Sequence, residues 1–133
     1  MRPARFQDFT LDLAKNTPGV TRVQTLADAG DTTRPFGVAI TTGDGEARRQ
    51  IIGQLADGEK HEQPDVPVSG DPFGTWAEPE PGDHEAWLAA VLARAESPEI
   101  ANIGRWSTRP GGKESPGLTV FFHNGARVFV RKI

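Results

Sequence analysis

The stretch LTVFFHNGARVFVR, residues 118–131, has the strongest β-strand signal in this chain. Two runs of β-branched and aromatic residues flank Asn124-Gly125, a dipeptide suited to the positive φ angles of a tight hairpin turn. A two-residue turn would pair Phe121 with Val128 and place Val120 opposite Phe129. The stretch therefore predicts an antiparallel hairpin.

This pairing would make both faces of the hairpin partly apolar. One face would carry Phe121, Val128 and Val130, and the other Leu118, Val120, Phe122 and Phe129 with Arg127 and Arg131. We expect one face to pack against helices. The second needs a cover, which the proline-rich loop, another sheet or a partner subunit could supply.

A second hairpin and a further strand are predicted in the first half of the chain. The strands are expected at residues 20–26, 36–41 and 46–55, with the turn at Gly43-Asp44-Gly45. The return strand contains Ile51 and Ile52 side by side, so its two faces are not cleanly divided between core and water.

Two helices are indicated by apolar spacing and by their ends. Residues 3–15 carry apolar side chains at helical spacing after Pro3, and residues 84–96 present one apolar face after the N-cap residue Asp83. A short helical piece at 97–102 and a strand at 103–107 are expected to follow.

These elements predict one α+β domain over residues 1–133, an antiparallel sheet of five or six strands with two helices packed on one face. Their order suggests two similar halves, but we found no matching residues to support a repeat. Residues 57–82 form an acidic, proline-rich loop, and Phe73 and Trp76 are expected to dock part of it onto the body.

Composition excludes several classes of protein. The 133 residues include no Cys, which rules out disulfides, thiolate metal sites and cysteine nucleophiles. No apolar run approaches the roughly 18 residues of a membrane span, so we expect a cytoplasmic protein that does not contact a membrane. The favoured residue types resemble those of a high-GC bacterial genome. The net charge of −3 divides into an acidic middle and a basic C-terminal part.

No motif for catalysis, metal binding or a cofactor is present. His61 lies in a polar loop without a framework for a metal site, and His84 lacks the second histidine of a zinc helix because Leu88 occupies that position. His123 could act as an acid or base, but no nucleophile accompanies it. We therefore expect no metal and no cofactor, and lean against an enzyme.

The best-defined group of functional residue types is a basic and aromatic cluster in the C-terminal part. It consists of Arg105, Trp106, Arg109, Lys113, His123, Arg127, Arg131 and Lys132, interleaved with Phe121, Phe122 and Phe129. Arginines beside aromatic rings on a sheet can hold single-stranded nucleic acid. The same aromatic residues would also build a core, which is the simpler interpretation.

The leading functional hypothesis is a non-catalytic protein-interaction domain that self-associates as a homodimer through the C-terminal sheet. The alternative is an anion or single-stranded nucleic-acid binder, and the third is a small enzyme whose site is assembled from scattered residues. The residues predicted to bind a partner are Trp76, Arg105, Trp106, Arg109, His123 and Arg127.

Overall fold

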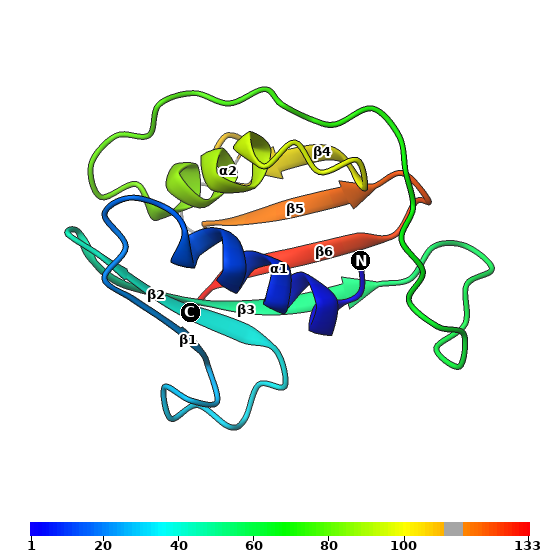
Figure 1. The fold of residues 1–133 in the computed structure, drawn as a ribbon, viewed down its shortest axis with the longest axis horizontal. Helices are drawn as coiled ribbons and strands as arrows, with labels where there is room; N and C mark the ends of the chain where they lie inside the picture. Colours follow the sequence, from blue (N-terminus) through cyan, green and yellow to red (C-terminus); the bar gives the residue numbers. More distant parts are fainter. Residues whose placement is uncertain (111–115) are drawn as a thin grey trace.

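The computed structural model describes residues 1–110 and 116–133. Its elements follow one another as α1 (Pro3–Lys15), β1 (Arg22–Thr25), β2 (Gly37–Thr42), β3 (Gly45–Gln54), α2 (His84–Arg94), β4 (Ile100–Arg105), β5 (Gly117–Phe122) and β6 (Arg127–Lys132) (Figure 1). Lys113, one member of the predicted basic cluster, lies outside the described residues.

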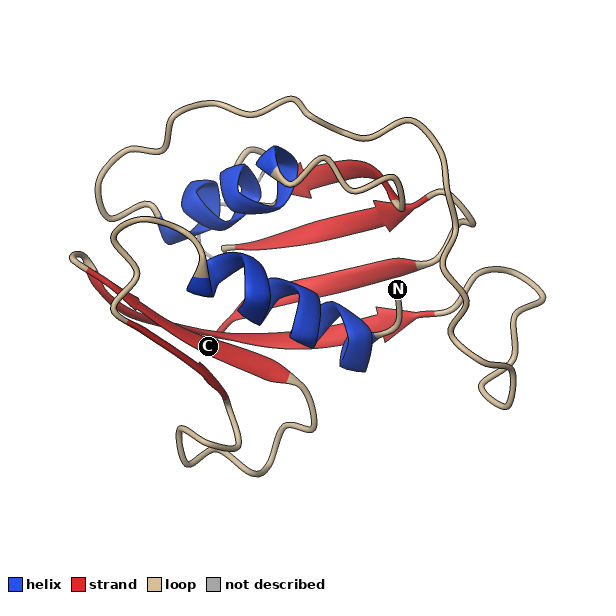
Figure 2. Ribbon diagram, viewed as in Figure 1, coloured by secondary structure: helices blue, strands red, loops and turns tan. Residues whose placement is uncertain are grey.

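The six strands form one antiparallel sheet in the order β1-β2-β3-β6-β5-β4. Figure 2 shows both helices on the same face of this sheet. The other face, called the open face below, is not covered by a helix. The predicted fold class, α+β with two helices on one face of an antiparallel sheet, is confirmed.

The chain contains two units of the same topology, each a helix followed by three strands. Strand β3 of the first unit pairs with β6 of the second, so the strand order is symmetric about this junction. Equivalent residues lie eighty positions apart: Gly37 and Gly117 begin β2 and β5, and Pro18 and Pro98 follow the two helices. The β1–β2 and β4–β5 registers also coincide at this spacing.

The two glycines that begin β2 and β5 make equivalent close contacts. A Cβ added to Gly37 would lie 2.2 Å from Cδ1 of Leu26, and one added to Gly117 would lie 2.5 Å from Cε3 of Trp106. Leu26 and Trp106 directly follow β1 and β4, and they too are eighty positions apart. Each unit thus folds a large side chain onto the first residue of its second strand, where only glycine leaves room.

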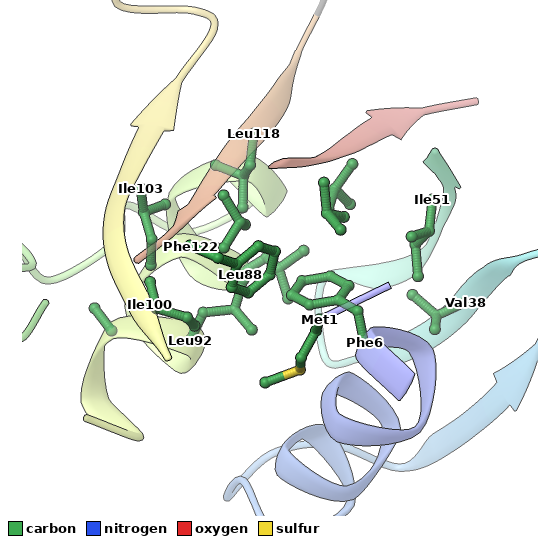
Figure 3. Packing of buried hydrophobic residues seen from close by; sticks show 14 of the residues in the cluster. Met1, Phe6, Val38, Ile51, Leu88, Leu92, Ile100, Ile103, Leu118 and Phe122 are labelled. Atoms are coloured by element: carbon green, nitrogen blue, oxygen red, sulfur yellow. The ribbon is translucent and has the colours of Figure 1, made fainter. Parts of the chain in front are cut away.

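The core lies between the helices and the sheet (Figure 3). Phe6 of α1 is completely buried, and its ring meets that of Phe122 edge to face with centroids 6.3 Å apart. The larger cluster includes Met1, Val38, Ile51, Leu88, Leu92, Ile100, Ile103, Leu118, Val120, Val128 and Val130. Because it draws on both units and both helices, the two units share one core.

The C-terminal hairpin has a different register from the one predicted. Phe121 pairs with Arg127 and Val120 pairs with Val128, so the predicted pairing is wrong by one residue. Leu118, Val120, Phe122, Val128 and Val130 therefore face the helices, whereas Thr119, Phe121, Arg127, Phe129 and Arg131 lie on the open face. A slip of one residue moves a whole strand to the other face of a sheet.

The turn explains this shift. The backbone N–H of Phe122 donates to the carbonyl of Ala126, which encloses a three-residue loop, His123–Gly125, where a two-residue turn was expected. The side-chain oxygen of Asn124 accepts a hydrogen bond from the N–H of Ala126, and Gly125 has φ 89°. Asn-Gly therefore forms the turn as predicted, but with one residue more.

The remaining predicted elements differ mainly at their ends. The side chain of Asp83 accepts a hydrogen bond from the N–H of Ala86 at 2.9 Å, which confirms the N-cap of α2. The short helical piece at 97–102 is wrong, because β4 already begins at Ile100. Ser97-Pro98 instead ends the connection from α2, and the strand predicted at 103–107 starts three residues earlier.

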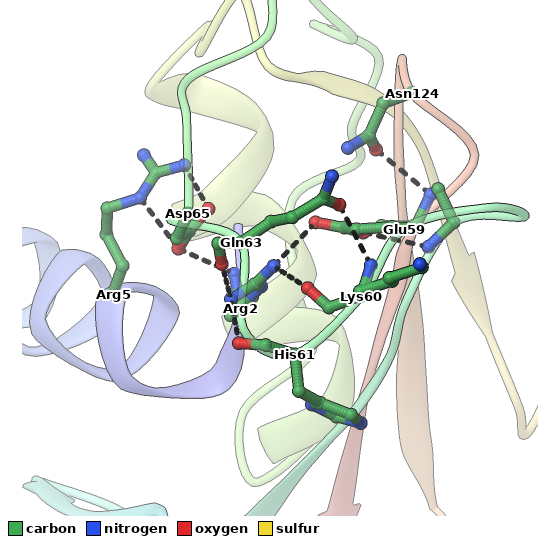
Figure 4. A network of polar contacts seen from close by, with 10 residues as sticks. Arg2, Arg5, Glu59, Lys60, His61, Gln63, Asp65 and Asn124 are labelled. Carbon is green, nitrogen blue, oxygen red and sulfur yellow. Dashed lines mark hydrogen bonds and ion pairs between the residues drawn. The ribbon is translucent and has the colours of Figure 1, made fainter.

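Ion pairs anchor the long loop between β3 and α2 to the start of the chain (Figure 4). Arg5 of α1 binds Asp65 through Nε at 3.0 Å and Glu99 through Nη2 at 2.7 Å. Arg2 binds Glu59 at 3.2 Å and donates to three loop carbonyls. The acidic character of this loop therefore serves, in part, to hold it against two N-terminal arginines.

The two aromatic residues of the loop behave differently. Phe73 packs against the core, and its backbone N–H donates to the carbonyl of Ile100, so this residue docks the loop as expected. Trp76 is 41 % exposed, and the guanidinium of Arg94 lies 4.9 Å from its ring centre. Only one of the two aromatic residues is therefore part of the packed body.

Candidate functional site

The structure brings together three of the six residues predicted to bind a partner. Trp106, Arg109 and Arg127 lie around the open face of the C-terminal unit. Arg105, His123 and Trp76 lie elsewhere, and each has contacts within the protein that account for its position.

Arg105 belongs to a polar network at the start of α2. Its Nε donates to Glu85 at 2.8 Å and its Nη2 to Asp83 at 3.1 Å. Glu85, 7 % exposed, also accepts hydrogen bonds from Gly117 N–H and from the N–H and hydroxyl of Ser107. Burial raises the pKa of Glu85, but these hydrogen bonds outweigh burial and leave the pKa below its ordinary value.

His123 and Trp76 contact the long loop or the helix side of the molecule. Nε2 of His123 lies 2.9 Å from the carbonyl oxygen of Asp71, and the imidazole ring packs so closely on Gly70 that a Cβ there would lie 2.6 Å from it. The ring of Trp76 stacks with Arg94 of α2. These contacts hold the loop in place and do not join the open-face group.

The open face carries an apolar row across four strands. The register aligns Ile52 with Phe129, Phe129 with Thr119, and Thr119 with Gly104. Trp106 lies over this row, and its indole N–H donates to the hydroxyl of Thr119 at 2.8 Å.

Phe121 occupies the neighbouring row, opposite Arg127. We call Ile52, Trp106, Phe121 and Phe129 the aromatic stripe. Ile52 is 42 % exposed, and the three aromatic side chains are half-buried. The stripe is thus a partly exposed apolar surface.

Arginines surround the aromatic stripe. The guanidinium of Arg127 lies 5.1 Å from the ring centre of Phe121, and that of Arg109 lies 5.3 Å from the ring of Trp106. Arg131 donates from Nη2 to the side chain of Gln50 at 3.0 Å. Within residues 1–110 and 116–133, these three arginines form no ion pair with a carboxylate. The stripe is therefore flanked by positive charge.

The sequence did not predict the aromatic stripe as a unit, because the expected register placed Phe121 and Phe129 on opposite faces of the hairpin. Ile52 was also missed, although the Ile51-Ile52 doublet already indicated that β3 presents an apolar side chain to each face. The structure places Ile51 in the core and Ile52 on the open face. That doublet was the one available signal.

Two further features bear on function. Among the described residues, no three histidine, aspartate or glutamate side chains are grouped so that they could hold a metal ion. In the same part of the chain, none of the helices has the length and apolar character needed to cross a membrane.

Comparisons with known proteins point to no relative. The chain matches no family model, no curated protein and no solved structure. The functional conclusion must therefore come from the residues of this chain.

Proposed function

We propose that this chain is a non-catalytic interaction domain that binds a protein partner through the aromatic stripe on the open face of its sheet. One observation carries the proposal: Ile52, Trp106, Phe121 and Phe129 form an apolar surface that neither helix covers. Contiguous apolar surface with a polar border is typical of interaction sites.

The composition of this surface supports a protein partner. Aromatic residues and arginine are enriched in protein–protein interfaces and dominate their binding energy. Arg127 and Arg109 each stack on an aromatic ring, so both guanidinium groups are held in place before a partner arrives. Such ordering lowers the entropy that binding would otherwise cost.

The charge of the surface supports an acidic partner. Arg109, Arg127 and Arg131 border the stripe without a paired carboxylate among the described residues. A partner that offers aspartate or glutamate side chains would neutralise these charges. Self-association of two open faces would place arginines against arginines, which opposes a symmetric dimer through this surface. The homodimer through the C-terminal sheet is nevertheless the prediction made from the sequence, and light scattering would check it.

Site-specific crosslinking can identify the partner. A photoreactive residue in place of Ile52 should capture a partner in cells, whereas the same residue at Asp12, exposed on α1, should not. With the purified partner, Arg127→Glu should weaken binding about tenfold or more. Arg22→Glu, an equally exposed charge reversal on β1, is the matched control and should bind normally. Equal capture at both positions, or normal binding by Arg127→Glu, would contradict the proposal.

Single-stranded nucleic acid is a second candidate, favoured by aromatic rings on an open antiparallel sheet flanked by arginines. A 20-nucleotide oligouridine is the probe. Binding should weaken with salt at a slope of about −2 on logarithmic axes, as expected for three arginine–phosphate contacts, and should be lost in Phe129→Ala. No binding at about 50 mM salt would exclude this candidate.

The remaining hypotheses stay predictions. A small enzyme would need a catalytic group beside a nucleophile. His84 and Glu85, whose pKa values are lowered, line a cavity, but Ser107, whose hydroxyl donates to Glu85, does not line it. The cytoplasmic location and the bacterial origin expected from composition are likewise predictions, which fractionation of the source cells would test.

A further inference from the structure

Arg49 of β3 is a buried arginine without a carboxylate partner among the described residues. Only 4 % of the residue is exposed, and it lies on the helix-facing side of the sheet. Its Nη2 donates to the carbonyl of His84 at 2.9 Å, and the guanidinium lies 5.9 Å from the ring of Trp87. Nη1 is buried and, in the described part of the chain, has no hydrogen-bond partner. A buried charge left in this state is costly.

A second cation lies beside it. The register of β3 and β6 places Lys132 directly opposite Arg49, with both side chains toward the helices. Like charges at opposed positions of a sheet destabilise it. The symmetric site on the same two strands holds Ile51 opposite Val130, both in the core. One side of the symmetry axis between β3 and β6 therefore has two cations where the other side has two apolar residues.

The two cations line a small cavity at the start of α2. Arg49, His84 and Lys132 form part of its wall, together with Glu85, Leu88 and Gly117. Its volume is about 10 Å³, room for one water-sized atom. Lys132 is exposed, so the cavity is bordered by the surface on its side. The N-terminus of α2, a helix of 11 residues, adds a positive dipole.

Glu85, the one carboxylate among the described residues of the wall, is already engaged. Glu85 accepts hydrogen bonds from Arg105, Gly117 and Ser107, and within the described part of the chain it forms no hydrogen bond with Arg49 or Lys132. These donors offset the negative charge of Glu85. The unpaired charge that faces the cavity is therefore positive.

We propose that this cavity is an anion site, in which one oxygen of a phosphate or carboxylate group accepts a hydrogen bond from Nη1 of Arg49. The rest of the anion lies at the mouth, beside Lys132 and His84. Such an anion supplies the partner that Arg49 lacks and separates the two opposed cations. This site is on the helix-facing side of the sheet, so it is independent of the aromatic stripe.

Protonation of His84 should strengthen this site. Burial, and then the charges of Arg49 and Lys132, lower the pKa of His84, while Asp44 and Asp83 act in the opposite direction. His84 is therefore neutral at pH 7 and gains a positive charge as the pH falls. Among the described groups around the cavity, Asp44, Asp83 and Glu85 are the carboxylates that oppose an anion.

Burial alone also lowers the pKa of Arg49, to about 10. A bound anion would raise this pKa again, because it favours the charged form of the guanidinium. Arg49 remains charged at neutral pH in either state, so the site is competent for anion binding under ordinary conditions.

Thermal unfolding in inorganic phosphate tests the site, at constant ionic strength maintained with sodium chloride. The midpoint of the wild-type protein should rise in a saturable manner, by about 8–10 °C at a hundredfold excess over Kd. Arg49→Met should lose this rise. Arg48→Met is the matched control, because the adjacent Arg48 lies on the opposite face of β3 and pairs with Glu46, and it should retain the rise.

A direct measurement makes the test independent of stability. Addition of phosphate should shift the NMR signals of the Arg49 guanidinium and the His84 ring with one common Kd. The pH dependence is measured with sulfate, whose charge is the same at pH 6 and pH 8, and the Kd for sulfate should be tighter at pH 6. Lys132→Met should weaken the Kd for phosphate several-fold. The proposal would be overturned if the wild-type signals showed no saturable shift, or if the His84 ring shifted equally in Arg49→Met. Only water would then occupy the cavity.

Discussion

The two halves of this molecule share one topology but differ in what they present at equivalent positions. Both fold a large side chain, Leu26 or Trp106, onto the glycine that begins their second strand. Near the junction of β3 and β6, however, Ile51 faces Val130 on one side of the symmetry axis while Arg49 faces Lys132 on the other. The shared positions maintain the fold, and both proposed sites lie where the halves differ.

The open face also differs between the two halves. In the C-terminal unit, Trp106 and Phe121 form part of the aromatic stripe, whereas the equivalent positions eighty residues earlier hold Leu26, which is buried, and Thr41. The N-terminal half of the open face is therefore less aromatic. A partner that binds aromatic rings would therefore contact mainly the C-terminal half of the sheet.

The largest expected effect concerns a residue that the two halves do not share. Phe6 of α1 is completely buried against Phe122, while the equivalent position in α2 holds the much smaller Ala86. Phe6→Ala should lower the free energy of unfolding by about 3–5 kcal/mol, because it leaves a cavity at the centre of the core. Urea denaturation would measure this loss. If Phe6→Ala lowered the free energy of unfolding only as much as Ala86→Gly does, the side chain of Phe6 would contribute no more to the core than that of Ala86.

The paired glycines test whether the two halves are equally constrained. An added Cβ would lie 2.5 Å from the carbonyl oxygen of Arg49 at Gly37, and 2.6 Å from that of Val130 at Gly117. Gly37→Ala and Gly117→Ala should each cost about 3 kcal/mol, since these backbone atoms cannot move aside cheaply. Gly43→Ala, with open space around it, is the control and should cost under about 0.5 kcal/mol. Unequal losses of the free energy of unfolding in Gly37→Ala and Gly117→Ala would show that the two halves are not equally constrained.

Acid should weaken the ion pairs that Arg5 of α1 forms with Asp65 and Glu99. Hydrogen bonds from Arg5 are the largest cause that lowers the pKa of both Asp65 and Glu99. Their stabilising contribution is present above the pKa values of the unfolded chain and is lost as the pH falls from about 5 toward the lower values of the folded state. Denaturation at pH 7, 5 and 3 should show a smaller loss in Arg5→Met than in the wild-type protein. An identical pH dependence would contradict this role.

The smallest expected effect concerns Arg49. In the absence of phosphate, Arg49→Met should change the free energy of unfolding by no more than about 1 kcal/mol, and in the stabilising direction, because the variant removes an unpaired buried charge. Val130, which takes the place of Arg49 in the symmetric pair Ile51–Val130, is apolar and buried. A clear destabilisation, measured in urea, would show that an anionic group already neutralises the guanidinium.

Much of the secondary structure could be predicted from the sequence, because it rests on short-range chemistry. The helix over residues 3–15 was predicted with the observed bounds, and Asp83 caps α2 as expected. Both hairpins appear at their glycine turns. In each case the deciding contacts join residues a few positions apart, and such contacts leave a local signature.

The candidate site could be predicted only in part. The structure places Trp106, Arg109 and Arg127 around one face of the sheet, and their role in binding stays a prediction. Arg105 is separated from them by its ion pairs with Glu85 and Asp83. Those partners are about twenty residues away in the sequence, and nothing local indicates them. The buried position of Arg49 was equally hidden, since an arginine in a strand of mixed residues normally lies in water.

By itself, then, the sequence determined the helices, the turns and the α+β class, because these depend on neighbouring residues. Only the tertiary structure decided the β3–β6 junction and the one-residue shift at His123–Gly125. Strand pairing is set by long-range packing, and a single residue of register moves every side chain to the other face. That shift put Phe121 and Phe129 on the same surface, and the junction placed Arg49 beside Lys132.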